Sequence, residues 1–319
     1  MSDFMVNLVQ ELALKRQILE KTAKSYVRIL FRLNGDKPYS NLSFLRHRDV
    51  VKQRIETYAQ SSQKQALTAI VAVLSLVKDK PAYKKLHQAY YDELMGSPPR
   101  PEGRSAKQEK VWKSWDWVLS HQKRLAEEVG KMSGVVAPRD AGKLSVRDWS
   151  KALEYLVLSL YTLIPPRRNE YQIMKIAMQD KHATDTNFNY CVLGSKRLIF
   201  HKYKTASKYG VQKQDIPPEL WAVIETYLSH YPVPYKKKSV FLLVHADGTP
   251  FTAVNSITRI LHHVFGEDIG SSMLRHIYLT DKYGDEKGEM SEDAEKMGHS
   301  VAVQQGVYVL PDDKHECKS

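Results

Sequence analysis

The segment Gly96–Gly103 limits the folds that are open to this chain of 319 residues. It reads Gly-Ser-Pro-Pro-Arg-Pro-Glu-Gly, so three prolines and two glycines fall within eight residues. Because proline lacks a backbone N–H and glycine is a poor helix former, no helix is expected to continue through it. A chain of this length is also long for one ordinary domain. We therefore predict two domains, residues 1–98 and residues 104–319.

Apolar periodicity predicts that the first domain is a bundle of helices. Residues 3–33 have a helical pattern that is interrupted near Lys21, and Thr22 is placed to cap the second part. Three further helices are expected at residues 49–58, 61–78 and 82–94. The first domain is therefore predicted to contain no strands.

The second domain mixes helices with short strands. Ser145 is placed as an N-cap, with Asp148 in the capping-box position, and starts an apolar helix that ends before Pro165. Further helices are expected at 106–132, from the Arg167 region to Met178, from Pro217, from an N-cap at Thr252, and at 271–283. Alternating side chains predict strands at 190–193, 197–205, 210–216 and 240–245. The predicted class is mainly α with a small antiparallel β-sheet, an α+β fold.

The charge of the chain favours a polyanionic partner. The formal net charge is +12. Residues 1–98 carry 16 Lys and Arg against 9 Asp and Glu, and the remainder carries 32 against 27. Binding to a nucleic acid profits from such an excess, because neutralised phosphates release their counterions. A basic protein that is merely soluble has the same balance, so charge alone does not decide.

Composition also limits the cellular compartments and the cofactors that are to be expected. No apolar run reaches the roughly 18 residues of a membrane-spanning helix, and the first residues lack the pattern of a secretory signal. Cys191 and Cys317 have neither a metal-ligand spacing nor a disulfide pattern. We expect an intracellular protein with no membrane segment, no metal and no cofactor.

Four short motifs carry chemistry-bearing side chains. In chain order they are Arg167-Arg168-Asn169-Glu170, Lys204-Thr205, Ser272-Met273-Leu274-Arg275-His276, and Gly298-His299 with Tyr308 nine residues after the histidine. Each has an ordinary structural explanation: a helix ion pair of Arg167 with Glu170, a solvated lysine, a capping histidine and a core tyrosine. Two arginines at a helix start oppose the helix dipole, so either Glu170 or a bound anion must compensate for them.

Taken together and in this order, the motifs resemble those of the tyrosine recombinases, the phage-integrase family. The amino-acid sequence around Pro165 is most similar to that of integrases of large eukaryotic DNA viruses and related mobile elements. The resemblance implies that residues 1–98 are a helical core-binding domain and that residues 104–319 are the catalytic domain. It further implies a double-stranded DNA partner and a homo-tetramer on paired DNA sites. The implied location is intracellular, with that DNA, in the host nucleus or a viral replication compartment if the chain is viral.

The same resemblance assigns the catalytic roles. Two guanidinium groups, of Arg167 and Arg275, would hold the phosphate oxygens on which charge develops. Lys204 would protonate the leaving 5′-oxygen, with Lys202 and Lys208 as alternatives. His299 would assist, and Tyr308 would attack the phosphate to form a 3′-phosphotyrosine without metal or ATP.

One position departs from the family pattern. Ser272 stands where the resemblance implies a histidine that donates to the scissile phosphate, and a serine offers only a short hydroxyl donor. His276 lies one residue after Arg275 and is expected to face elsewhere on the helix. Ser272 is thus an open candidate for contact with the substrate phosphate.

Two other functions remain open from the sequence. A type IB topoisomerase would use closely related chemistry to relax DNA. A DNA-binding factor with a decayed active site is the second alternative, and Ser272 is the feature that favours it. The presence of both arginines, the lysine and the tyrosine favours an enzyme, because a binding protein needs no nucleophile.

Overall fold

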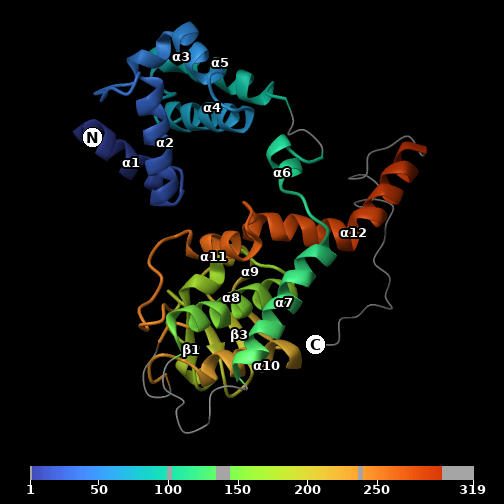
Figure 1. The fold of residues 1–319 in the computed structure, drawn as a ribbon. Helices are drawn as coiled ribbons and strands as arrows, with labels where there is room; N and C mark the ends of the chain where they lie inside the picture. The colour runs from blue at the N-terminus through green and yellow to red at the C-terminus, as the bar shows by residue number, and fades with distance from the viewer. Residues whose placement is uncertain (1, 99–102, 134–143, 236–239, 297–319) are drawn as a thin grey trace, which may run out of the picture. The chain divides into compact units, whose positions relative to one another are not determined.

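The computed structural model describes residues 2–98, 103–133, 144–235 and 240–296. The chain divides into two compact units, Met1–Gly103 and Arg104–Ser319 (Figure 1). Each unit contains its own buried apolar cluster. The chain is mainly helical and has one small sheet, which is an α+β composition.

The described part of the first unit is built from helices alone. They are α1 (Asp3–Lys15), α2 (Glu20–Leu33), the 3-10 helix η1 (Ser43–Arg46), α3 (Arg48–Glu56), α4 (Gln60–Leu74) and α5 (Pro81–Met95). Helix α2 packs on α1 and α4, and α4 packs on α5. Their apolar faces meet at fully buried side chains that include Leu12, Leu30, Leu33, Ile70 and Leu74.

The predicted cap of α2 is wrong. Leu19, not Thr22, precedes the helix, and the backbone N–H groups of Thr22 and Ala23 donate to its carbonyl oxygen. The helix therefore starts almost one turn earlier than predicted. Glu20 in its first turn is favourable there, because the N-terminal end of a helix dipole is positive.

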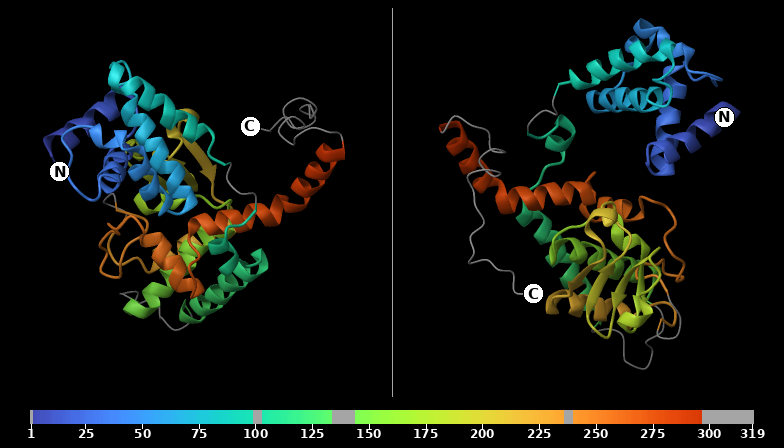
Figure 2. Two further views of the ribbon diagram at one scale, coloured as in Figure 1. Left: turned by 90° about the horizontal axis from the view of Figure 1, so that it is seen from above. Right: turned by 180° about the vertical axis from the view of Figure 1, so that it is seen from behind.

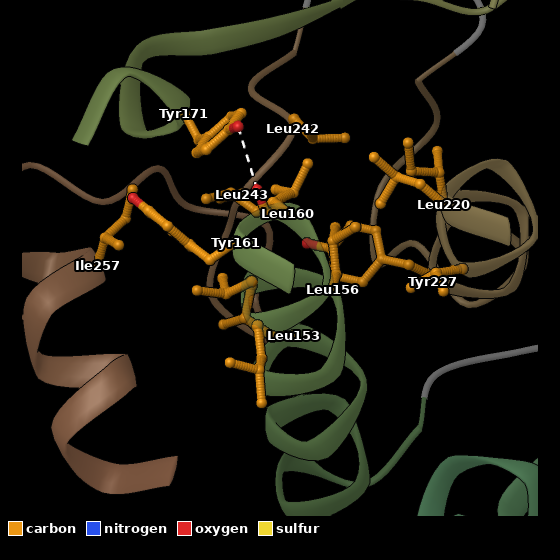
Figure 3. Packing of buried hydrophobic residues seen from close by; sticks show 14 of the residues in the cluster. Leu153, Leu156, Leu160, Tyr161, Tyr171, Leu220, Tyr227, Leu242, Leu243 and Ile257 are labelled. Atoms are coloured by element: carbon orange, nitrogen blue, oxygen red, sulfur yellow. Dashed lines mark hydrogen bonds between the residues drawn. The ribbon is translucent and has the colours of Figure 1, made fainter. Parts of the chain in front are cut away.

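Helix α8 (Val146–Thr162) is the centre of the second unit and contacts α7 (Trp115–Ser133), α10 (Pro218–Ser229) and α11 (Ser256–Phe265). Its N-cap is the predicted one, since the Ser145 hydroxyl accepts from the Asp148 N–H at 3.1 Å. Figure 3 shows Leu156, Leu160 and Tyr161 of α8 among buried side chains from the surrounding elements.

The remaining helices of the second unit are α6 (Ala106–Lys110), the single turn α9 (Ala206–Tyr209) and α12 (Ser271–Lys296). The helix predicted at 106–132 is thus divided, because Ser114 accepts a hydrogen bond from the Trp117 N–H and starts α7 afresh. The cap predicted at Thr252 is also wrong, since Asn255 precedes α11.

A four-stranded sheet lies beside α8 (Figure 2). Its strands are β1 (Met174–Ala177), β2 (Asn189–Val192), β3 (Arg197–Phe200) and β4 (Gln212–Asp215), in the order β1-β2-β3-β4. Strand β1 runs parallel to β2, whereas the other pairs are antiparallel. The sheet is therefore mixed, and the prediction of a purely antiparallel sheet is wrong.

The segment after Arg167 departs most from prediction. Instead of a helix to Met178, the chain forms the 3-10 helix η2 (Asn169–Ile173) and then β1. Backbone bonds tie β1 to the neighbouring segment, from the Ile176 N–H to the Val240 oxygen and from the Leu242 N–H to the Met174 oxygen. Pairing with distant residues overrides the local helical pattern here. The strand predicted at 240–245 is reduced to isolated bridges at Phe241 and Val244.

Candidate active site

Arg167 follows the pair of prolines after α8 and is half-buried. Its Nη2 donates to Gln212 Oε1 of β4 at 2.9 Å. Its guanidinium carbon lies 3.8 Å from the centre of the Phe200 ring and 5.4 Å from that of Tyr203. Stacking on an aromatic face and a side-chain acceptor together fix a planar guanidinium in orientation.

The charge of Arg167 is not neutralised by Glu170. Within the described residues neither side chain forms a salt bridge, and Arg167 Nε and Glu170 Oε2 are buried without hydrogen-bond partners. The helix ion pair that would have explained this motif structurally is therefore absent from the described part of the chain. A buried donor without a partner is costly, and a bound anion would satisfy it.

Arg275 lies in the second turn of α12, and the start of this helix is joined to the Arg167 segment. The hydroxyl of Ser271 donates to Asn169 Oδ1 at 2.7 Å. Burial raises the pKa of Tyr161, with further upward contributions from Tyr171 and Glu170, while Ser271 and Arg275 oppose them. Arg275 is thus close enough to the Tyr161 phenol to act on it electrostatically.

Both arginines act on one pair of tyrosines. Burial raises the pKa of Tyr171, and the Arg167 charge lowers it. The rings of Tyr161 and Tyr171 are 5.4 Å apart and meet edge to face. Tyr161 donates to the Arg168 carbonyl at 2.7 Å, and Tyr171 donates to the Leu160 carbonyl at 3.1 Å (Figure 3). The structure therefore brings Arg167 and Arg275 into one neighbourhood.

Lys204 does not lie on a strand. Because β3 ends at Phe200, the prediction of a strand over residues 197–205, which would include Lys202 and Lys204, is wrong beyond Phe200. Both belong to the turn between β3 and α9, and Lys208 belongs to α9. All three side chains are exposed.

Asn189, which the sequence analysis missed, links this lysine turn to the arginine segment. Its Nδ2 donates to the carbonyl oxygens of Glu170 at 2.9 Å and Lys202 at 3.1 Å, and its Oδ1 accepts from the Lys202 N–H at 2.8 Å. The side chain is fully buried and uses both amide hydrogens. Its only signal in the sequence is a polar residue directly before an apolar strand.

Of the other predicted site residues, the structure describes Ser272 but not His299 or Tyr308. Ser272 is exposed on α12 and lines a pocket of about 360 Å³ that His276 also lines. His299 and Tyr308 lie outside the described residues, because the described chain stops at Lys296. The structure thus brings together Arg167, Arg275 and the lysine turn.

Three observations concern metal binding, the buried thiol and membrane-spanning helices. Among the described residues, no group of three or more His, Cys, Asp or Glu side chains is arranged to bind a metal. Burial raises the pKa of Cys191 to about 12, so its thiol stays protonated near neutral pH. None of the helices in the described ranges is both long enough and apolar enough to span a bilayer.

Comparison of the chain with models of protein families, with curated proteins and with solved structures finds no match.

Proposed function

We propose that this protein is a tyrosine-type DNA strand transferase, a site-specific recombinase or integrase. The observation that carries the proposal is the buried Nε of Arg167, which has no partner, together with the hydrogen bond from Ser271 to Asn169 that joins the start of the helix bearing Arg275 to the Arg167 segment. Two preorganised guanidinium groups suit a phosphodiester, since they bind its non-bridging oxygens bidentately. The order of the four sequence motifs supports the same chemistry.

The proposed reaction is balanced by the side chains of the chain itself. The Tyr308 oxygen attacks phosphorus, the bond to the 5′-oxygen breaks, and a 3′-phosphotyrosine forms. A lysine of the turn after β3 gives a proton to the leaving 5′-oxygen, and His299 takes the phenolic proton. The phosphotyrosine keeps the energy of the broken phosphodiester bond. Religation can therefore reverse these steps without ATP.

A nicked suicide DNA duplex tests this proposal directly. Cleavage near the nick releases a short strand that cannot religate, so a covalent adduct accumulates. We expect an adduct with the unaltered protein and none with Tyr308→Phe, which loses one oxygen and should still bind DNA. Tyr278→Phe and Tyr283→Phe, which alter tyrosines earlier in the chain, serve as controls and should retain the adduct. DNA mapped to any residue other than Tyr308 would contradict the proposal.

Two alternatives give different products in the same experiments. A DNA-binding factor with a decayed site, which the exposed serine at 272 favours, would bind the duplex without forming an adduct. A type IB topoisomerase would form the adduct and relax a supercoiled plasmid that carries no paired sites. A recombinase would join two sites and, on paired DNA, would assemble as the proposed homo-tetramer, which mass measurement of the complex can check.

A further inference from the structure

The pocket beside the start of α12 contains an imidazole that the proposed reaction does not yet use. Its volume is about 360 Å³, and its lining includes Lys107, Asn169, His262, Asp268, Ser272 and His276. These residues come from α6, the Arg167 segment, α11, the loop between α11 and α12, and α12. Most of them offer hydrogen-bond donors.

His262 is held in place by a carboxylate. Its Nε2 lies 3.1 Å from Asp268 Oδ1, and Asp268 Oδ2 lies 3.3 Å from the Lys107 ammonium. The single carboxylate therefore has partners on both oxygens and also orients the ring. The His262 side chain is 35% exposed, so part of the ring remains accessible.

The start of α12 packs closely on α11 at Gly270. A Cβ added at Gly270 would lie 3.8 Å from His262 Nε2 and only 3.1 Å from Thr258 Cγ2. Gly270 is two residues before Ser272, the position where the resemblance implies a histidine. His262 of α11 and Ser272 of α12 line the same pocket, so an imidazole is present on the pocket wall opposite the serine's helix.

The pocket also adjoins the arginine cluster. Asn169 lines the pocket, lies two residues after Arg167 and accepts the hydrogen bond from Ser271. Ser272 and His276 of α12 also line the pocket. The pocket therefore borders the segment that carries Arg167, and a phosphodiester held by this arginine would lie near these donors.

We propose that His262, oriented by Asp268, donates a hydrogen bond to the substrate phosphate and replaces the imidazole that Ser272 lacks. This inference rests on the proposed function. The Asp268 carboxylate accepts at Nε2, which leaves Nδ1 to face the phosphate, and an imidazole that carries both protons can donate from both nitrogens at once. No bond is made or broken at His262.

The test measures the single-turnover rate of adduct formation on the suicide duplex at saturating DNA. Removal of one preorganised donor typically costs ~10²-fold in rate, which we expect for His262→Ala. The decisive variant is His262→Ala combined with Ser272→His, which should recover at least about tenfold of that loss. Rescue by an imidazole on another helix is not expected if His262 only supports the fold.

Three controls separate the possible explanations. His263→Gln alters the next histidine of α11, which pairs with Glu154 instead, and should cleave at the normal rate. His276→Ala tests the other imidazole of the pocket. His262→Gln, which keeps a polar side chain of similar length, replaces His262→Ala if the alanine variant does not fold.

The outcomes distinguish this proposal from the proposed function. If the unaltered protein forms an adduct and His262→Ala cleaves equally fast, the role of His262 is refuted alone. A loss that Ser272→His does not rescue, or a loss seen only in His276→Ala, also overturns it. If the unaltered protein gives no adduct, both proposals fail.

Discussion

At the scale of single residues, the surroundings of Arg167 explain why an arginine is required there. Its planar guanidinium lies 3.8 Å from the Phe200 ring centre and donates to Gln212 at 2.9 Å. A lysine ammonium is a compact point charge that neither stacks in this way nor forms a fork. The geometry, rather than the charge alone, is therefore expected to matter for the reaction.

Arg167→Lys tests this distinction. We expect the rate of adduct formation to fall by ~10²–10³, whereas DNA affinity should change little because the charge is kept. Arg168→Lys is the matched control, since Arg168 is exposed and offers only its backbone carbonyl to Tyr161. Equal losses of rate in the two variants would mean that the contacts of Arg167 with Phe200 and Gln212 do not matter for the reaction.

At the scale of elements, the sequence predicted best where a helix has one apolar stripe and a clear cap. Helix α8 is such a case, with Ser145 at its start and Leu153, Leu156 and Leu160 buried. Helix α12 continues to Lys296 (Figure 1) and was predicted too short, because residues 279–290 are almost all exposed and form no apolar stripe. Strand β1 was missed because its partners are distant in the sequence.

The candidate site could likewise be predicted from the sequence only in part. The four motifs identified Arg167 and Arg275, since their side chains are chemically distinctive and fall in a family order. Nothing local pointed to Asn189 or Gln212, because their importance comes from hydrogen bonds to residues 13 to 45 positions away. Positioning residues of this kind become visible only when the chain is folded.

Asn189 gives a prediction at the scale of elements, since it joins the start of β2 to η2 and to the turn after β3. Asn189→Ala removes the part-buried hydrogen bonds to three backbone groups of Glu170 and Lys202, which should lower the free energy of unfolding by about 2–5 kcal/mol. Asn187→Ala, on an exposed residue that bonds only Asp185, should change it by less than about 0.5 kcal/mol. Urea unfolding measures both, and equal values would contradict the linking role.

At the scale of the whole molecule, each unit has its own core and its own excess of positive charge. In the first unit, Lys21, Lys24 and Arg28 of α2 line a pocket together with apolar side chains. In the second, Arg167, Arg275 and the lysine turn form the candidate site. Under the proposed function both units contact DNA phosphates, the first for binding and the second also for chemistry.

Salt dependence tests this division of roles. If the full chain contacts about six phosphates, its affinity for duplex DNA should fall by roughly 10³ or more between 50 and 200 mM salt. A protein limited to residues 104–319 retains the core of the second unit, so it should fold and bind with a shallower slope, because the phosphate contacts of the first unit are lost. Circular dichroism checks that this fragment is folded. Equal slopes for the two proteins would show that the cations of residues 1–103 touch no phosphate, and a flat response of the full chain would assign its charge to solubility alone.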